Sequence, residues 1–576
     1  MEVAAGLGLG PDLAEPYGRH RAKISLDALA PPSDSKQEVD RTQGSSGPLR
    51  ATRGPSGPLS GKRGPSGPLS GKLGRYILVS AVTPTAAGEG KTVTSIGLTM
   101  GLATLGHRAA ASLRQSSLGP TFGGKGGGAG GGKAIIAPLD ECLLGLGDDL
   151  FAVESANNLL AAVLDDHVHR NGSPAIDARS ITWRRAVDVD DRALRRVVTG
   201  LGGTIDGVPR ETGFDITAAS EVMAILGLSS DLADLRRRLA EIVVGFGRDG
   251  TPVKASSLHV VGAMVALLQR ALQPNLMQTA EGDPIFVHTG PFANIAHGNS
   301  SVVADLIALP RVDYLVTEAG FATELGAEKF FHLKCAATGL APDASVCVVT
   351  VRALKSHVPG APLDSEDVGA LRVGAANLGA HVANLRHFGA PVVVAVNRFP
   401  TDTPAELAAL REEALAAGAV AVAAHDAFGQ GGVGATELAQ AVVDACDAST
   451  PVPVLRLYDL DDDPVEKVRK VATTLYGAAD VQWEPSASRA LARFVKAGYG
   501  RLPVCIAKTN LALSHDPNHR GAPTGYTFPV REVRLAAGAG FLTVLAGSIV
   551  TMPGLPPGSR YTGIDVGEDG QVVGLR

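Results

Sequence analysis

The sequence predicts an α/β protein in which a parallel sheet carries helices on both faces, followed by a second, smaller α/β domain and a strand-rich C-terminal region. Three observations predict this fold class. Short apolar runs alternate with stretches of helical apolar spacing, a pattern typical of parallel β-α units. The 576 residues are too many for one compact core. A hydrophobic fraction of 45% and a charged fraction of 19% are typical of globular proteins.

Six apolar runs, rich in β-branched residues, are the expected strands of the parallel sheet. They lie at residues 76–80, 284–287, 312–317, 346–351, 391–396 and 419–424. A second unit begins after residue 380, and the chain becomes rich in strands and turns from Leu502 onward. We therefore predict a large nucleotide-binding domain over 73–380 with an N-terminal segment at 1–42, a second α/β domain over 381–500 and a C-terminal domain over 501–576.

Residues 43–72 form a low-complexity insert with a ten-residue repeat of the type RGPSGPLSGK. Serine, glycine and proline with one leucine per unit bury too little apolar surface to offset the entropy of ordering the chain. We expect a disordered linker here. A basic docking segment is the alternative, because every unit carries lysine or arginine.

Charge and cysteine content exclude several function classes. The net charge is −5 and aromatic residues make up 4%, so we expect no nucleic-acid partner. Five cysteines without C-x-x-C spacing fit a reducing cytoplasm, and we find no targeting signal at the N-terminus. Residues 535–556 are uncharged, but their glycines, prolines and β-branched clusters predict strands and turns rather than a membrane span.

The strongest local signal is the segment 80–94 (SAVTPTAAGEGKTVT), where an expected strand runs into a glycine-rich loop and then into helical spacing at 93–105. This is a P-loop-type arrangement, in which backbone N–H groups surround phosphate oxygens while a lysine and a hydroxyl contact the phosphates and Mg²⁺. Thr85 stands in place of the first glycine. A glycine-rich turn without a ligand is the alternative. The predicted nucleotide-binding residues are Thr85, Ala86, Ala87, Gly88, Glu89, Gly90, Lys91 and Thr92, with Thr92 as the Mg²⁺ ligand through ATP.

A second anion-binding signal follows at residues 112–132, where Arg114 precedes a run of glycines. An arginine holds a carboxylate or an acyl phosphate through two parallel N–H bonds, which a lysine cannot do. A flexible glycine-rich loop without such a role is the alternative.

Several long motifs together resemble the formate–tetrahydrofolate ligase family, also called 10-formyltetrahydrofolate synthetase. The resemblance covers nearly the whole chain outside residues 31–72. The motifs are 156–162 (ANNLLAA), 181–185 (ITWRR), 207–217 (GVPRETGFDIT), 290–298 (GPFANIAHG), 317–321 (TEAGF), 507–509 (AKT), 513–517 (LSHDP) and 551–556 (TMPGLP).

The resemblance implies an ATP-dependent ligase of one-carbon metabolism. In such an enzyme ATP phosphorylates formate, and N10 of tetrahydrofolate attacks the resulting formyl phosphate to give 10-formyltetrahydrofolate, ADP and phosphate. Lys91 is then expected on the transferred phosphoryl group and Arg114 on formyl phosphate, as the two catalytic residues. A monovalent cation, K⁺ or NH₄⁺, and a homotetramer are further implications.

Folate-binding residues are implied in the same way. In the family an Arg-Phe-Pro turn and a second aromatic about thirty residues further on enclose the flat pterin. Here these positions are Phe399, Pro400 and Phe428. Phe428 stands where the family has tryptophan, which gives a smaller stacking surface. The alternative for either phenylalanine is a plain core position.

The chain departs from the family at positions close to the predicted site. Loss of proton carriers near an anion site keeps a second hypothesis open, a homologue that binds nucleotide or folate with little or no catalysis. A partitioning-type ATPase, which shares only the loop, is disfavoured by Thr85 and by the C-terminal motifs. The substituted positions are Gln115 and Ser116 for Glu-Pro, Gly145 and Phe151 for two histidines, and Asn299 with Ser300 where a cysteine is usual.

Four further polar residues have open roles. His288 and His297 flank the 290–298 motif, and such histidines are more often structural hydrogen-bonding groups than catalysts. Glu318 and Glu324 follow the strand expected at 312–317, at the edge where α/β sites form. Each glutamate is a candidate for Mg²⁺, for a monovalent cation or for a solvated surface position.

Overall fold

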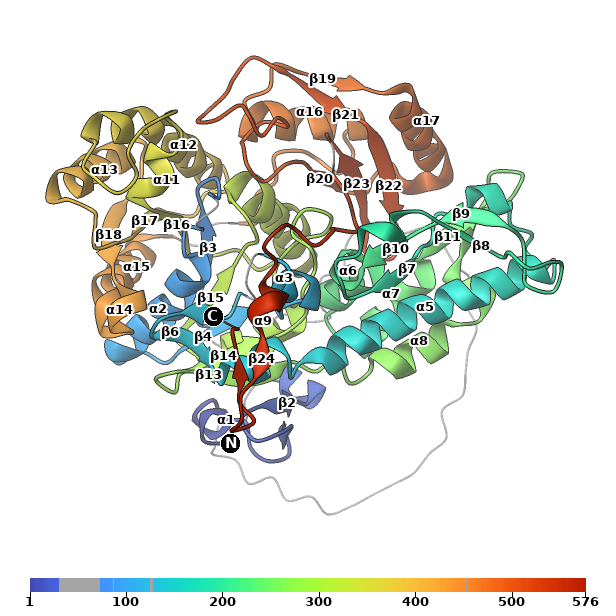
Figure 1. The fold of residues 1–576 in the computed structure, drawn as a ribbon, viewed down its shortest axis with the longest axis horizontal. Coiled ribbons are helices and arrows are strands. Elements are labelled where there is room, and N and C mark those ends of the chain that lie inside the picture. The colour runs from blue at the N-terminus through green and yellow to red at the C-terminus, as the bar shows by residue number, and fades with distance from the viewer. Residues whose placement is uncertain (31–72, 86–87, 125–127, 451–452, 548, 576) are drawn as a thin grey trace.

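A computed structural model describes residues 1–30, 73–85, 88–124, 128–450, 453–547 and 549–575 (Figure 1). The repeat at 43–72, for which the sequence predicts disorder, lies outside the described residues. Two of the predicted nucleotide-binding residues, Ala86 and Ala87, lie outside them as well.

A 12-stranded sheet forms the centre of the molecule and confirms the predicted α/β fold class. Its main path runs β1-β2-β13-β14-β4-β15-β3-β16-β17-β18. Neighbouring strands from β14 to β18 are parallel, whereas β1, β2, β13 and β14 pair antiparallel at one edge. The strands are β1 (Ala14–Pro16), β2 (Ala22–Ile24), β3 (Arg75–Ala81), β4 (Ala109–Leu113), β13 (Asn275–Thr279), β14 (Pro284–Val287), β15 (Tyr314–Glu318), β16 (Ala344–Val349), β17 (Val392–Asn397) and β18 (Ala421–His425), with β5 (Gly130–Gly131) and β6 (Ala134–Ala137) beside β13.

Both faces of the parallel sheet are buried, which explains why its strands read as continuous apolar runs. On β3, Ile77 and Val79 contribute to a core shared with α2 and α15, whereas Leu78 contributes to the larger core on the other face. Alternate side chains of one strand therefore serve two cores. The helices on the two faces are α2 (Lys91–Thr104) and α15 (Thr436–Ala448) on the first, and α9 (Val302–Ala308), α11 (Val351–Lys355), α12 (Val368–Arg386) and α13 (Pro404–Ala416) on the second.

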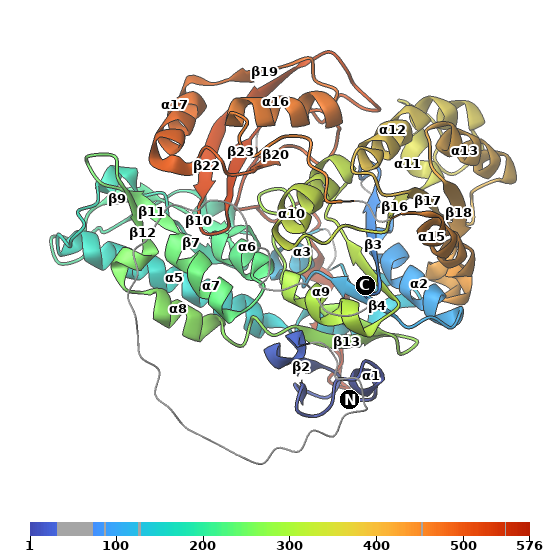
Figure 2. The ribbon, with the colours of Figure 1, turned by 180° about the vertical axis from the view of Figure 1, so that it is seen from behind.

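A group of helices and short strands between β6 and β13 packs beside the antiparallel edge of the sheet (Figures 1 and 2). Helix α8 contacts both α5 and α7. The elements are α5 (Gly147–His169), α6 (Glu221–Leu228), α7 (Leu232–Glu241) and α8 (Val261–Leu268), with the strand pairs β7 (Arg185–Val187) and β10 (Phe214–Ile216), β8 (Val197–Thr199) and β9 (Arg210–Thr212), and β11 (Val243–Phe246) and β12 (Pro252–Lys254).

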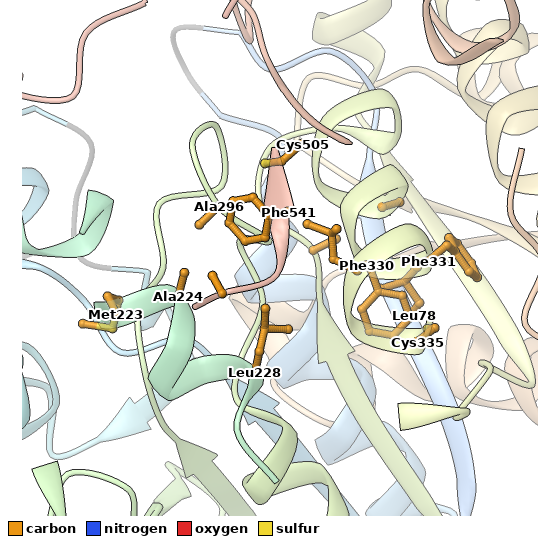
Figure 3. Close-up of a cluster of buried hydrophobic side chains, with 14 of the residues drawn as sticks. Leu78, Met223, Ala224, Leu228, Ala296, Phe330, Phe331, Cys335, Cys505 and Phe541 are labelled. Carbon is orange, nitrogen blue, oxygen red and sulfur yellow. The ribbon is translucent and has the colours of Figure 1, made fainter. Parts of the chain in front are cut away.

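Residues 464–545 gather at one end of the molecule, where β20, β23 and β22 form a three-stranded sheet (Figures 1 and 2). The chain then returns to the central sheet, beside which β24 (Asp565–Val566) lies. Figure 3 shows Phe541 of β23 beside Ala296, so this sheet shares the large core. The described residues of the uncharged segment 535–556, which leave out residue 548, form strand, turn and irregular structure and no helix, as predicted. No helix of the described residues is long and apolar enough to cross a membrane. The elements are α16 (Pro464–Leu475), β19 (Asp480–Trp483), α17 (Pro485–Phe494), β20 (Val504–Ala507), β21 (Thr527–Val530), β22 (Glu532–Ala536) and β23 (Phe541–Leu545).

The structure differs from the sequence analysis in a few places. The alanine-rich strand β4 was not predicted, because alanine is depleted in strands and only tertiary burial selects it here. The run expected at 346–351 ends as a strand at Val349, since the Thr350 side chain accepts from the N–H of Ala353 and starts α11. The boundary near residue 380 falls within α12, and β17 and β18 belong to the central sheet. The division into domains stays a prediction.

Candidate functional site

The glycine-rich loop lies between β3 and α2, at the carboxyl edge of the parallel sheet. Gly88 and Gly90 both have a φ of 75°, a left-handed conformation that glycine adopts without strain. Glu89 is buried, and its Oε1 accepts a hydrogen bond of 2.8 Å from the backbone N–H of Thr85. This carboxylate therefore closes the loop at the position where the first glycine of the pattern is missing.

Gly90 fits tightly between the start of α2 and the end of β17. The side-chain nitrogen of Asn397 donates to the carbonyl oxygen of Glu89 at 3.0 Å, and a Cβ added to Gly90 would lie 2.2 Å from that nitrogen. Sequence reasoning did not single out Asn397. Asn397 directly follows the apolar run 391–396, and a polar residue in that place is expected at the carboxyl edge of a parallel sheet, where ligands bind.

Gly90→Ala is expected to weaken ATP binding at least ~10-fold and to lower the free energy of unfolding by about 1–3 kcal/mol, since the new methyl group meets both an unfavourable φ and Asn397. Isothermal titration with ATP and Mg²⁺ measures the first effect, and thermal unfolding the second. Gly106→Ala is the matched control, because Gly106 has a φ of +90° but no atom within 4 Å of its Cβ position. Equal ATP affinity in the two variants would contradict this account of the loop.

Lys91 and Thr92 begin α2, so the N–H groups of the first helical turn face the loop, as an anion site requires. The Lys91 ammonium donates to the carbonyl oxygen of Phe321 at 3.3 Å, and the Thr92 hydroxyl donates to Glu318 Oε2 at 3.0 Å. Glu318 ends β15, the strand beside β3. The structure thus brings together the predicted lysine, the predicted threonine and one of the two glutamates whose role was open.

Arg114 directly follows β4 and lies at the same edge of the sheet, because β4 and β3 are both neighbours of β15. Its Nη1 donates to the carbonyl oxygen of Pro291 at 3.4 Å, and its buried Nε has no hydrogen-bond partner among the described residues. Within the described ranges neither Arg114 nor Lys91 forms an ion pair. Both side chains are partly exposed, so a ligand can reach them.

The surroundings stabilise these two cations less than water does. Desolvation lowers the pKa of Lys91, the nearby charge of Arg114 lowers it further, and Glu318 and Glu89 oppose the shift. Desolvation also lowers the pKa of Arg114, against Glu318. Because both net shifts disfavour the charged forms, a bound anion would stabilise the site.

The predicted folate residues lie at the ends of two adjacent parallel strands. Phe399 and Pro400 come after β17, and Phe428 comes after β18 within the short helix α14 (Ala427–Gln430). The Arg352 guanidinium lies 3.9 Å from the centre of the Phe399 ring, and a Cβ on Gly131 would lie 3.2 Å from Phe428 Cε2. One side of each ring is therefore covered by the protein. Phe428 is 59% exposed, so it is not a plain core residue.

The two histidines beside the 290–298 motif are fully buried. His288 bonds Ser301 Oγ at 2.6 Å and the carbonyl oxygen of Ala271 at 2.7 Å, which is a structural role, and burial lowers its pKa to about 3. His297 has no hydrogen-bond partner for either ring nitrogen among the described residues, and burial holds its pKa well below the usual value. Both rings are neutral at neutral pH.

The substituted positions surround the cations to different degrees. Gln115 is buried beside Arg114, where its Nε2 donates to the carbonyl oxygen of Leu146. Arg21 donates to the carbonyl oxygen of Gly145, and a Cβ at Gly145 would lie 2.9 Å from Arg21 Nη1, so this arginine occupies the space of a side chain there. Phe151 is 69% exposed on α5.

The remaining substituted positions follow His297 in the chain. Asn299 is buried and donates from Nδ2 to the carbonyl oxygen of Glu318 at 3.4 Å, and Ser300 donates to the carbonyl oxygen of His288 at 3.3 Å. Asn299 therefore contacts the backbone of the residue that holds Thr92. Ser116, next to Gln115, is partly buried.

Several resemblance motifs meet elsewhere, around a cavity of about 430 Å³ between α6, β11 and the C-terminal strands. Trp183, Arg184, Asp215 and Thr551 line it, and Arg184 Nη1 donates to Asp215 Oδ1 at 2.8 Å. These motifs hold the C-terminal region against the rest of the chain, and the loop residues are not part of the lining.

The oxygen groups at the start of α2 fit Mg²⁺. A hydroxyl and a carboxylate, Thr92 Oγ1 and Glu318 Oε2, lie 3.0 Å apart beside the phosphate loop, and oxygen is the ligand type that Mg²⁺ prefers. Within the described residues no group of three or more His, Cys, Asp or Glu side chains is arranged to hold a metal ion. A metal at Thr92 would thus share its ligands with a phosphate, as is usual for this ion.

Fold and site together define the class: an α/β protein with a P-loop-type loop between a parallel strand and a helix. Two cations, Lys91 at the start of that helix and Arg114 just after β4, form no ion pair within the described residues. A family model described as formate–tetrahydrofolate ligase matches residues 68–576. Relatives called formate–tetrahydrofolate ligase are 50% identical in Saccharopolyspora erythraea over 585 residues, 50% in a Roseiflexus species over 583 residues and 48% in Chloroflexus aurantiacus over 589 residues. Each alignment covers 100% of this chain and 96% or 97% of the relative. The chain belongs to the formate–tetrahydrofolate ligase family, which confirms the resemblance.

Proposed function

We propose that the protein is an ATP-dependent formate–tetrahydrofolate ligase that forms 10-formyltetrahydrofolate, ADP and phosphate through formyl phosphate. The observation that supports this most directly is the pair of under-compensated cations, Lys91 at the start of α2 and Arg114 just after β4, at the same edge of the sheet. A lysine in a glycine-rich loop suits a transferred phosphoryl group, and an arginine beside it suits the acyl phosphate product. The names of the relatives give no support to a non-catalytic homologue.

The first step transfers the γ-phosphoryl group of ATP to a formate oxygen and releases ADP. Lys91 would stabilise the negative charge on the oxygens of the transferred phosphoryl group, and the N–H groups of the loop and of α2 would orient the nucleotide. Mg²⁺, held through Thr92 with Glu318 behind it, would neutralise phosphate charge. Positioning and electrostatics therefore supply most of the catalysis.

In the second step N10 of tetrahydrofolate attacks the formyl carbon, the bond to the phosphate oxygen breaks, and the nitrogen loses its proton. Arg114 would hold the phosphate as it leaves through two N–H bonds, which its unpaired Nε and weakly bound Nη1 leave available. Gln115 stands where the family has a carboxylate, so proton transfer at this position requires another group or water.

A direct assay tests the proposed function. Purified protein is mixed with ATP, Mg²⁺, formate and tetrahydrofolate in potassium buffer, and 10-formyltetrahydrofolate is followed as the methenyl absorbance that acid generates. Product formation that requires all three substrates supports the ligase. A protein that binds ATP or tetrahydrofolate in calorimetry but forms no product would instead be the binding homologue.

The folate residues of this proposal lead to a prediction on tetrahydrofolate affinity. Phe399→Ala is expected to raise the KM for tetrahydrofolate about 10-fold, and Phe428→Trp to lower it, because stacking on an aromatic ring contributes about 1–3 kcal/mol. Steady-state rates at saturating ATP and formate measure both. The control is Val373→Ala, which shortens an exposed apolar side chain on α12. An unchanged KM in Phe399→Ala would place the pterin elsewhere.

The proposal extends to points that follow from the family resemblance alone. A K⁺ or NH₄⁺ ion as activator, a homotetramer and a cytoplasmic location belong to it. Ligase rates in potassium, ammonium and sodium buffers test the first, and light scattering of the purified protein tests the second.

A further inference from the structure

A buried row of polar side chains on α12 faces the residues that hold the phosphate loop. Asn377, His381 and Asn384 are 0%, 0% and 4% exposed, and their spacing of four and three residues puts them on one side of the helix. Helix α12 packs on β16 and β17 (Figures 1 and 2). A polar row in such an apolar setting is costly unless every group is bonded, so its partners define its role.

His381 bonds two separate segments of the chain through its two ring nitrogens. Its Nε2 lies 2.9 Å from the backbone nitrogen of Thr83 and 3.0 Å from the Thr83 hydroxyl, and its Nδ1 lies 2.7 Å from Thr323 Oγ1. A backbone N–H can only donate, so Nε2 accepts and Nδ1 carries the proton that it gives to Thr323. Burial lowers the pKa of His381 to about 4, against the nearby Glu324, so this neutral form persists at neutral pH.

One bonded residue precedes the phosphate loop, and the other begins the short helix Thr323–Ala327 just after Phe321. Thr83 lies just after β3, where the chain leaves the sheet for the phosphate loop, and Asn377 Nδ2 donates to its hydroxyl at 2.9 Å. Thr323 lies two residues after Phe321, whose carbonyl oxygen accepts from Lys91 at 3.3 Å. The imidazole ring therefore joins the chain that enters the phosphate loop at Thr83 to the segment whose carbonyl oxygen accepts from Lys91.

The C-terminal region contacts Glu324, the residue that follows Thr323 in the chain. Lys508, in one of the resemblance motifs, donates to Glu324 Oε1 at 3.0 Å and to the carbonyl oxygens of Thr509 and Ala512. Lys508 and Glu324 are both 0% exposed. Glu324, left open between a metal ligand and a surface position by sequence reasoning, is thus a buried ion-pair partner beside Thr323.

We propose that His381 is a positioning residue for the phosphate loop: by joining the Thr83 backbone to Thr323 it fixes the loop and Lys91 in the geometry that receives the triphosphate. The inference rests on the proposed function, since it assumes that ATP occupies this loop. It assigns no contact between His381 and the substrate. The bond to the backbone N–H of Thr83 fixes the chain where it leaves β3 for the loop.

Replacing His381 by glutamine or by asparagine tests its hydrogen bonds to Thr83 and Thr323 separately, because both replacements are amides of different length. Glutamine places an amide near the position of Nε2 and keeps the bond to Thr83, whereas asparagine places it near Nδ1 and keeps only the bond to Thr323. In the full-length enzyme, His381→Gln is expected to keep the KM for ATP within about twofold of wild type. His381→Asn is expected to raise it about tenfold and to lower kcat, with the KM for tetrahydrofolate unchanged.

A buried histidine away from the loop provides the control. His288→Asn removes a ring that is also 0% exposed and bonded on both nitrogens, and it is expected to lower thermal stability without changing the KM for ATP. Equal KM values for ATP in His381→Asn and His381→Gln, or a rise in the KM values of both substrates together, would overturn the inference. An inactive wild-type protein would instead contradict the proposed function. Should His381→Asn fail to fold, a tenfold rise in the KM for ATP of His381→Gln would overturn the inference on its own.

Discussion

Replacing Lys91 by alanine is expected to lower formation of 10-formyltetrahydrofolate by at least ~10³-fold, because no other cation in the described residues begins α2 beside the phosphate loop. Lys91 lies at the N-terminus of a 14-residue helix, and among the described residues its ammonium donates only to the carbonyl oxygen of Phe321. Its charge is therefore available to a ligand rather than used in an ion pair. The methenyl absorbance assay on the purified variant gives the rate.

The loss must be specific to the site. Lys496→Ala removes an exposed lysine from the C-terminal region and is expected to leave the rate unchanged. Lys91→Ala should also unfold at no lower temperature than wild type, since removing a desolvated, unpaired ammonium relieves rather than creates an electrostatic cost. A Lys91→Ala enzyme with more than a tenth of the wild-type rate would show that the phosphoryl group binds elsewhere.

Replacing Arg114 by lysine is expected to lower kcat by about 10²-fold, and replacement by alanine by about 10³-fold, at nearly unchanged KM for ATP. Lysine keeps the charge but loses the paired N–H bonds that match an acyl phosphate. Because Arg114 follows β4 while the nucleotide loop follows β3, the variant should affect formyl phosphate more than ATP. Single-turnover mixing of enzyme, ATP and formate before tetrahydrofolate separates the two steps.

Arg108→Lys is the matched control for this prediction. Arg108 lies just before β4 at its opposite end, where it pairs with Asp313 at 2.8 Å and its side chain is 67% exposed. Surface pairs of this kind contribute little to stability or to a distant site. If Arg114→Lys retained the wild-type kcat, the arginine would act only as a point charge and the bidentate assignment would be wrong.

Replacing Lys91 or Arg114 is expected to have a large effect because the protein provides little negative charge to stabilise either cation. The charge of Glu318 raises the pKa of both cations, yet its Oε2 accepts from the Thr92 hydroxyl, and desolvation dominates the pKa shifts of both cations. An anionic ligand completes such a site, whereas a neutral one does not. The same reasoning explains why the phosphate product should leave more slowly when Arg114 is retained than when it is removed.

The sequence by itself determined the family, the fold class and the positions of Lys91, Thr92 and Arg114. Five of the six predicted strand runs contain four or five strand residues and no helical residue, because both faces of the parallel sheet are buried and continuous apolar runs report that burial directly. The sixth, at 346–351, gave its last residue to a helix through the Thr350 cap. The phosphate loop could be predicted from the sequence because its glycines, lysine and threonine lie close together in the chain.

Only the tertiary structure decided which distant residues support those positions. The strand β4 carries Arg114 but consists mostly of alanine, so its place beside β15 follows from packing rather than from propensity. Asn397 reaches Glu89, Asn299 reaches Glu318 and His381 joins Thr83 to Thr323 across hundreds or tens of residues. The physical reason is that strand order in a parallel sheet differs from chain order, so the side chains that meet at its carboxyl edge have no fixed spacing in the sequence.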